Sequence, residues 1–372
     1  MTQIANVLKE RGHRVSFAVQ RVDALGAEDA GGSAVWPAPV TPRLLVNTAR
    51  PKSAHPNSMG DIMTRLGCDD AGLVAAMVRA WLQLFDAVRP DLVIAEFAPF
   101  LLLASRGRLP SVAGGTGFDT PPSGMPAFPS LTGQPPVFAE AETLGRVNEA
   151  LRATETAPLS ALPEMFRADR ELAGTYRELD GYHAWREQPL VMPALAPPPP
   201  MIAPGGGEEV FVYAPELLSV DSELWQGLAG SKLPVRVHIP KVPESYREAL
   251  RGLGFIVEPE PVPFPLIAER SRLLVSHGGH GFVCSGLLAG LPQVICHYDL
   301  EKIMHAHAVT KLGVGGFVPL MHIDPTAFAA SLVRLYGDDA LHARAQSAAP
   351  AFHARYAEPM EQSMAKAAES LL

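Results

Sequence analysis

The chain has 372 residues, 47% hydrophobic and 19% charged, and a net charge of −8 at pH 7, so its length suits two domains and its acidic balance argues against nucleic acid or an anionic membrane as partner. Its three cysteines, Cys68, Cys284 and Cys296, stand at no metal-ligand spacing and predict reduced thiols in a cytoplasmic protein. No uninterrupted run of 18 apolar residues and no signal-peptide pattern is present, so no transmembrane segment is expected.

The first half of the chain alternates apolar runs with helical patterns. An amphipathic helix is predicted over 1–11, a long helical region over 59–88 and a further helix over 140–153, with an irregular connection over 40–58. Apolar residues at helical spacing predict the core face of the long region: Leu73, Met77, Trp81, Leu84, Phe85 and Val88. The predicted strands are 15–19, 34–37, 91–95, 111–114 and 171–176.

Residues 115–133 form a loop rich in glycine and proline, without a periodic pattern. A loop of this length in a compact domain is usually functional or mobile. Its apolar residues either line a cleft for a hydrophobic small molecule or fold back as a flap on their own domain, and the sequence leaves both open: Phe118, Met125, Phe128 and Leu131.

The clearest boundary is the segment 193–207, PALAPPPPMIAPGGG. Its prolines make it stiff and its glycines make its end pliable. We therefore expect a first domain over 1–192, a linker over 193–207 and a second domain over 208–358. Residues 359–372 are expected to form a last helix, with Pro359 suited to its first turn.

The second half repeats the alternation, which indicates a parallel sheet with right-handed crossovers. Its predicted strands are 210–213, 235–239, 255–257, 273–275 and 293–297. Its predicted helices are 219–228, 244–251, 282–289, one opening at Asp299, 325–336, and 339–372 with interruptions near Pro350 and Pro359.

A glycine turn separates one of these strands from its helix: Ser276-His277-Gly278-Gly279-His280-Gly281. Glycines allow a sharp bend and a close approach to a ligand, and the first amides of the following helix have no partner within it. The segment therefore predicts an anion site, with phosphate as the expected ligand. On the glycines alone, a simple tight connection is an equal interpretation.

The full order is strand, SHGGHG, helix, Leu-Pro, strand, and Asp299-Leu300-Glu301-Lys302 opening a helix. This order resembles the donor-sugar segment of nucleotide-sugar glycosyltransferases of the GT-B fold, in particular family 1 and its bacterial relatives that act on macrolides, carotenoids and flavonoids. The resemblance is specific over 255–320 and continuous but weaker elsewhere. It implies an α/β protein of two Rossmann-like parallel-sheet domains facing a cleft, the first binding the acceptor and the second the donor. It also implies that the last helix, 359–372, crosses back to the first domain.

The resemblance also assigns a donor site to these residues: Val262, Ser276, His277, Gly278, Gly279, Gly281, Phe282, Glu301 and Lys302. It implies that His277 contacts the diphosphate, that the backbone of Val262 pairs with the base, and that Glu301-Lys302 holds the sugar hydroxyls.

Three positions depart from the pattern. Phe282 replaces a Thr or Ser and offers only its amide, while Ser285 replaces a ribose-binding Glu. Lys302 replaces a Gln, which implies a preference for a different or even acidic sugar.

The implied reaction moves a hexose from a UDP- or dTDP-sugar to a hydroxyl of a small hydrophobic acceptor, with inversion, without metal and without a cofactor beyond the donor. In many relatives a histidine on a loop after a first strand is the general base, and no position here matches it. Because the chain opens on a helix, we expect either a start recorded too far downstream or a fragment. Glu96, at the end of strand 91–95, is either the carboxylate that orients this base or a solvated one.

Three alternatives remain beside this interpretation. The first is a non-catalytic or inactive nucleotide-sugar binder, indicated by the departures above. The second is a sugar-nucleotide epimerase, which shares the architecture but whose own motifs are absent from the sequence. The third is a zinc site, which draws on several ligand types but matches no zinc spacing: His277, His280, Glu301, His305 and His307.

Overall fold

The computed structural model describes residues 1–24, 26, 30–45, 55–195, 201–216 and 218–372. The chain divides into two compact units: unit 1 is Met1–Ala194 with Glu358–Leu372, and unit 2 is Leu195–Ala357. The division after Ala194 falls inside the segment expected to be the linker, and the glycine-rich end of that segment belongs to unit 2. Residues 196–200 of the segment lie outside the described residues.

Unit 1 contains parallel strands in two sheets. β1 (Ser16–Val19) pairs with β2 (Ala34–Pro37), and β4 (Ser111–Gly115) lies between β3 (Val93–Ala95) and β5 (Arg170–Ala173). The predicted strands and their parallel direction are confirmed, but within the described part of unit 1 they form two sheets rather than one.

The helices of unit 1 cover these sheets and include the last helix of the chain. They are α1 (Thr2–Glu10), α3 (Pro42–Leu45), α4 (Met59–Met63), α5 (Ala71–Val88), α6 (Pro99–Ser105), α7 (Glu140–Arg152) and α15 (Met360–Glu369). The prediction of one helical region over 59–88 is wrong. A π-helical turn, Thr64–Cys68, follows α4, Gly67 has φ +108°, and the Asp70 carboxylate then caps α5 by accepting the Leu73 N–H at 3.0 Å.

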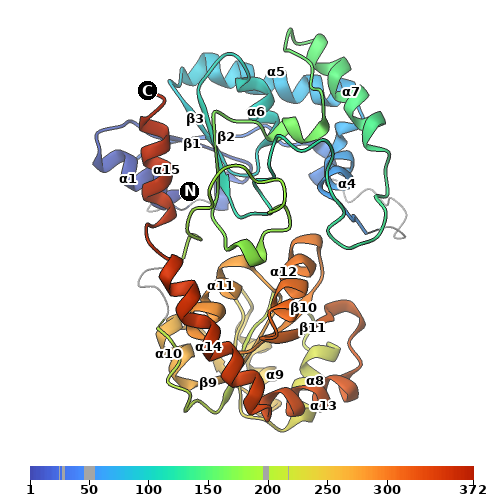
Figure 1. The fold of residues 1–372 in the computed structure, drawn as a ribbon, viewed down its shortest axis with the longest axis vertical. Helices are drawn as coiled ribbons and strands as arrows, with labels where there is room; N and C mark the ends of the chain where they lie inside the picture. The colour runs from blue at the N-terminus through green and yellow to red at the C-terminus, as the bar shows by residue number, and fades with distance from the viewer. Residues whose placement is uncertain (25, 27–29, 46–54, 196–200, 217) are drawn as a thin grey trace. The chain divides into compact units, whose positions relative to one another are not determined.

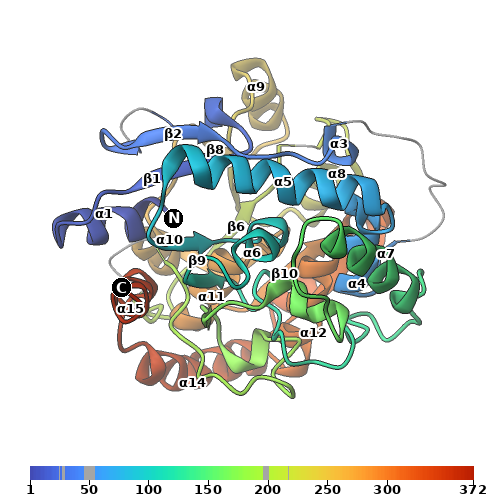
Figure 2. The ribbon, with the colours of Figure 1, turned by 90° about the horizontal axis from the view of Figure 1, so that it is seen from above.

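α5 is long and apolar enough, by length and composition alone, to cross a membrane. It contacts α6 and α7, as can be followed in Figure 2, and buries one face of small and large apolar residues: Val74, Ala75, Met77, Val78 and Trp81. The predicted core stripe is correct for Met77 and Trp81, whereas Leu73, Leu84, Phe85 and Val88 are only half-buried.

The first and last helices of unit 1 pack side by side (Figure 1). Their apolar residues form one cluster with Val112 of β4: Ile4, Val7, Leu8, Met360, Met364, Ala365 and Ala368. Arg11 adds an ion pair with Glu369 at 2.7 Å. A Cβ atom on Gly114 would lie 2.4 Å from Met364 Sδ, so the bare glycine leaves room for this side chain.

The long loop after β4 is held by buried polar groups. Asp61 is 1% exposed, and its carboxylate accepts four backbone N–H groups at 2.8–3.2 Å: those of Asn57, Ser58, Val137 and Phe138. Nearer the start of the loop, the buried Arg186 pairs with Asp180 at 2.6 Å and donates to the carbonyls of Gly117 and Thr120.

The apolar side chains of this loop are largely shielded from solvent. Phe118, Met125 and Phe128 are buried, and Leu131 is half-buried. Phe128 meets the ring of Phe166 edge-on at 6.0 Å, so the flap alternative describes Phe128.

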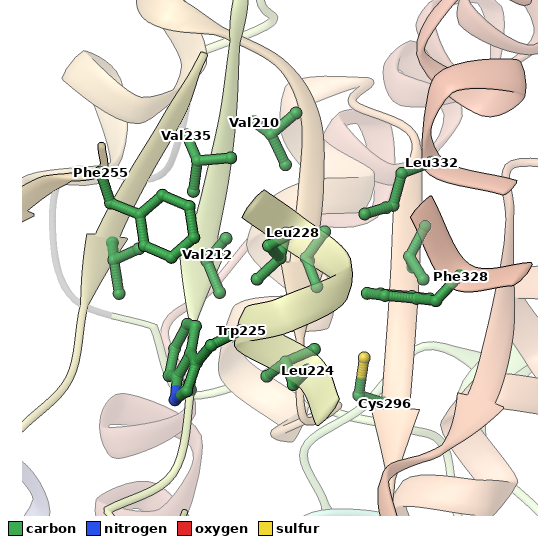
Figure 3. Close-up of a cluster of buried hydrophobic side chains, with 14 of the residues drawn as sticks. Val210, Val212, Leu224, Trp225, Leu228, Val235, Phe255, Cys296, Phe328 and Leu332 are labelled. Atoms are coloured by element: carbon green, nitrogen blue, oxygen red, sulfur yellow. The ribbon is translucent and has the colours of Figure 1, made fainter. Parts of the chain in front are cut away.

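Unit 2 is built on one parallel six-stranded sheet with the order β11-β10-β9-β6-β7-β8. The strands are β6 (Glu209–Tyr213), β7 (Val235–His238), β8 (Ile256–Glu258), β9 (Ser271–Ser276), β10 (Gln293–His297) and β11 (Gly315–Pro319). The helices are α8 (Glu223–Ser231), α9 (Glu244–Gly252), α10 (Phe264–Arg270), α11 (His280–Ala289), α12 (Leu300–Lys311), α13 (Pro325–Tyr336) and α14 (Asp339–Arg355). Figure 3 shows the core on one face of this sheet, where Trp225 and Leu228 of α8 meet Val212, Phe255 and Phe328.

The parallel α/β prediction for this half is confirmed, with three differences. α10 and β11 were not predicted, and α14 continues through Pro350. Ala349 and Phe352 on either side of that proline are buried, and α14 packs on α11, so tertiary contacts outweigh the lost backbone hydrogen bond.

Candidate functional site

The strand order of unit 2 defines a switch point between β6 and β9. From β6 the chain runs outward through β7 and β8, and then returns to β9 on the other side of β6. Open parallel α/β sheets bind ligands at the carboxyl ends of the strands at such a point. Tyr213 ends β6 and His277 follows β9, with their ring centroids 5.3 Å apart. The candidate site therefore lies at this edge.

The glycine turn after β9 has the geometry that its sequence predicted. Gly278 has φ +90° and its N–H donates to Ser276 Oγ at 3.2 Å, and Gly279 is the residue before the first turn of α11, which contains Gly281. A Cβ atom on Gly278 would lie 2.6 Å from Cγ2 of the buried Ile295, so this position requires glycine. The first amides of α11 have no acceptor within the helix and can bind an anion.

His277 lies between two aromatic rings. Its ring centroid is 5.3 Å from that of Tyr213 and 6.1 Å from that of Tyr298. Burial lowers the pKa of His277, and the nearby Lys302 cation lowers it further. A hydrogen bond with the Tyr213 backbone acts in the opposite direction. The ring is therefore neutral at pH 7, and its buried Nδ1 has no hydrogen-bond partner among the described residues.

The predicted sugar-contacting pair forms an internal ion pair. Lys302 Nζ binds the Glu301 carboxylate and lies 3.5 Å from Asp299 Oδ2, while Asp299 Oδ1 caps α12 by accepting the Lys302 N–H at 3.0 Å. Two carboxylates thus balance one ammonium group. This arrangement leaves Lys302 without an excess positive charge for an acidic sugar.

Phe282 faces aromatic neighbours. Its ring lies 5.3 Å from that of Tyr213 and 5.5 Å from that of Phe264, and it borders one apolar cluster together with Val262. Val262 and Phe282 are both partly buried against this cluster. Ser285 lies farther along α11 and is 8% exposed.

Glu96 lies in unit 1, exposed at the carboxyl end of β3, and the described residues form no hydrogen bond or ion pair with it. Phe97, which follows, has φ +41°, an uncommon backbone conformation for a bulky residue. His13, near the end of α1, contacts Glu369 at 3.4 Å and does not approach Glu96 through any described contact. The described part of unit 1 therefore gives Glu96 no histidine to orient.

The histidines considered for zinc do not form a metal centre. Among the described residues no group of three His, Cys, Asp or Glu side chains lies close enough to hold a metal ion. His280 and His305 have ring centroids 5.4 Å apart, and both are buried. Burial lowers the pKa of each, that of His280 to about 3, so both rings are neutral at pH 7.

Two residues of this edge were missed by sequence reasoning. Tyr213 was only the end of a predicted strand, and its neighbours become visible once β6 is known to pair with β9. His305 was considered only as a metal ligand, but its Nδ1 lies 2.8 Å from the Gly278 carbonyl oxygen. The sequence did contain a signal for His305: it stands one helical turn after Lys302, so both residues lie on the same face of α12.

The comparisons with known proteins agree on the type of fold. Residues 239–371 match the model for the erythromycin biosynthesis protein CIII-like C-terminal domain. A comparison with curated proteins by sequence gives no match.

Among solved structures, the calicheamicin glycosyltransferase CalG4 aligns with a TM-score of 0.69 at 19% identity, covering 100% of this chain and 94% of its own. The spinosyn rhamnosyltransferase SpnG complexed with spinosyn aglycone aligns with a TM-score of 0.64 at 17% identity, covering 99% and 95%. The glycosyltransferase VinC in complex with dTDP aligns with a TM-score of 0.63 at 17% identity, covering 100% and 96%.

The GT-B fold expected from the sequence is thereby confirmed for the whole chain. The resemblance of its second half to proteins of natural-product biosynthesis is confirmed by the match of residues 239–371 to that C-terminal domain.

Proposed function

We propose that this chain is a glycosyltransferase that moves a hexose from a UDP- or dTDP-sugar to a hydroxyl of a small hydrophobic acceptor, with inversion at the anomeric carbon. The observation that carries the proposal is the glycine turn with His277 at the β6–β9 switch point. The likeness to the VinC complex with dTDP and to the SpnG complex with an aglycone supports the choice of substrates. The three cysteines are free and buried, in keeping with a cytoplasmic reaction.

In this reaction the acceptor oxygen forms a bond to the anomeric carbon while the bond from that carbon to the diphosphate breaks. The negative charge that develops on the leaving diphosphate needs donors arranged in advance. The neutral His277 ring and the amides at the start of α11 supply such donors. They need no metal ion to do so, and the acceptor proton passes to a general base.

A second candidate is a protein that binds nucleotide-sugars without transferring them. It is favoured by Glu96, which has no histidine partner among the described residues, and by the Glu301–Lys302 ion pair, which engages both groups expected at the sugar.

The test combines turnover and binding. UDP- and dTDP-hexoses are incubated with a panel of macrolide, phenolic and terpenoid alcohols, and released nucleotide and glycoside are quantified by chromatography. Transfer should occur with at least one pair, the product should have the opposite anomeric configuration by NMR, and His277→Ala should lower kcat/KM by about 100-fold, the usual effect of removing one transition-state donor. Calorimetric binding of UDP or dTDP without transfer would support the binder, and no binding of either would exclude both candidates.

A further inference from the structure

We propose that His305 is a positioning residue for the donor diphosphate: its side chain holds the carbonyl of Gly278 and thereby aims the amide of Gly279 at the phosphate. The inference rests on the proposed function for its ligand, but the contact on which it stands belongs to unit 2 alone.

The contact is short and fully buried. His305 lies in α12 with 0% exposure, and its Nδ1 is 2.8 Å from the Gly278 carbonyl oxygen. A second contact lies one helical turn earlier, because a Cβ on Gly278 would be 3.5 Å from Cβ and Cγ of Lys302. The glycine turn therefore rests on one face of α12.

The partners determine the protonation state of His305. A carbonyl oxygen only accepts hydrogen bonds, so Nδ1 must carry the proton. Burial lowers the pKa of His305, so the ring holds no second proton at pH 7 and its Nε2 is unprotonated. Among the described residues this buried Nε2 has no hydrogen-bond partner, so the contact with Gly278 is what fixes the ring.

The peptide between Gly278 and Gly279 converts this contact into an orientation. In a trans peptide the C=O and the following N–H point to opposite sides. Because the Gly278 carbonyl points toward His305 of α12, the Gly279 N–H points away from α12. Gly278 has φ +90°, and as a glycine it can adopt other backbone angles. Without the hydrogen bond from His305, the peptide between Gly278 and Gly279 can therefore rotate, and the Gly279 N–H no longer points at the phosphate.

A matched pair of variants isolates the hydrogen bond. His305→Asn keeps an N–H donor at the atom bonded to Cγ, where Nδ1 of histidine stands, whereas His305→Leu has a methyl group there. Both shorten the side chain, so both leave a similar gap. Affinity for UDP or dTDP, whichever the wild type binds, and for the corresponding nucleoside is measured by calorimetry, with melting temperature as a check on folding.

We expect His305→Leu to weaken nucleoside diphosphate binding about tenfold and His305→Asn to stay within about threefold of wild type, since one hydrogen bond at the diphosphate is lost in the first only. Nucleoside binding should be the same in all three proteins. Equal diphosphate affinities in all three, or equal losses in both variants for diphosphate and nucleoside, would overturn the positioning role.

A second measurement needs no nucleotide. In protein labelled with 15N-histidine and 15N-glycine, the NMR signals of His305 should show the neutral tautomer with the proton on Nδ1, and the Gly279 amide signal should shift in His305→Leu but return toward wild type in His305→Asn. A proton on Nε2 would refute the contact. If the wild type binds neither nucleotide, the proposed function fails, and the tautomer still decides whether His305 holds the turn.

Discussion

Replacing Gly278 with alanine tests how closely the turn is fitted to the sheet. The backbone at Gly278 has φ +90°, which costs a residue with a Cβ atom about 1–2 kcal/mol. The new Cβ would also stand 2.6 Å from Cγ2 of Ile295, a fully buried residue of β10 that cannot swing aside. Relieving an overlap of this kind costs about 1–3 kcal/mol. The expected loss is about 2–5 kcal/mol in the free energy of unfolding.

Gly254 provides the matched control within unit 2. It also has φ +90°, but no heavy atom lies within 4 Å of the Cβ that alanine would add. Gly254→Ala should therefore show the backbone cost alone, about 1–2 kcal/mol. Urea unfolding of wild type and both variants gives the difference between them, which measures the contact with Ile295.

Calorimetry with UDP and dTDP then relates the turn to binding. Gly278→Ala should abolish the binding heat, because the turn must open to admit the methyl group, while Gly254→Ala should bind as wild type does. Equal losses of stability in the two variants would refute the reasoning, since the neighbour at 2.6 Å would then have no effect.

Three further substitutions test other parts of the structure. Burial lowers the pKa of His280 from 6.5 to about 3. Below pH 6.5 the ring is therefore protonated in the unfolded state but neutral in the folded state, and the free energy of unfolding falls as the pH drops. At pH 5 this ring lowers the free energy of unfolding by about 2 kcal/mol. Urea unfolding at several pH values should show a weaker pH dependence of this free energy in His280→Leu than in the wild type. The same pH dependence in both proteins would contradict the reasoning. Asp61→Asn should cost about 2–4 kcal/mol by the same method, because the amide presents N–H groups to backbone N–H donors, and a neutral result would mean that the carboxylate does not hold the loop. Met364→Ala, at a residue with 0% exposure, should cost about 2–5 kcal/mol and speed hydrogen exchange in α15 and α1, whereas unchanged exchange would show that the helices are held by other contacts.

Where the sequence contains strong local signals, the first and last residues of a helix or strand could be predicted from it. β10 was predicted over 293–297 after Leu291-Pro292, and α13 over 325–336, where the Asp324 side chain accepts the Ala327 N–H at 2.7 Å and proline opens the helix. Such signals act within one turn of the chain, so the sequence alone contains them.

Elements decided by tertiary contacts were not predictable in the same way. The apolar spacing over 59–88 runs through Gly67 without a visible break, because the residues on both sides of the turn are buried in the same unit. The prediction at Pro350 failed in the opposite direction. Proline predicted an interruption of the helix there, but α14 continues through Pro350 because it packs on α11. In both cases the information lies in residues distant in sequence.

The candidate site shows the same division. The turn at 276–281 was predictable, because its glycines and the flanking strand and helix are contiguous. Tyr213 was not, since its ring meets His277 only because β6 and β9 are neighbours in the sheet. His305 was seen, but its role depends on a buried contact with a carbonyl 27 residues away.

The shared cluster of α1 and α15 has a consequence for synthesis. During translation, residues 1–194 leave the ribosome long before residues 358–372, which complete the same hydrophobic cluster, have been made. The intervening unit is continuous in sequence and can reach its final state first. Nascent chains stalled before residue 358 should therefore keep α1 open to chaperones, and its release should coincide with emergence of the last helix.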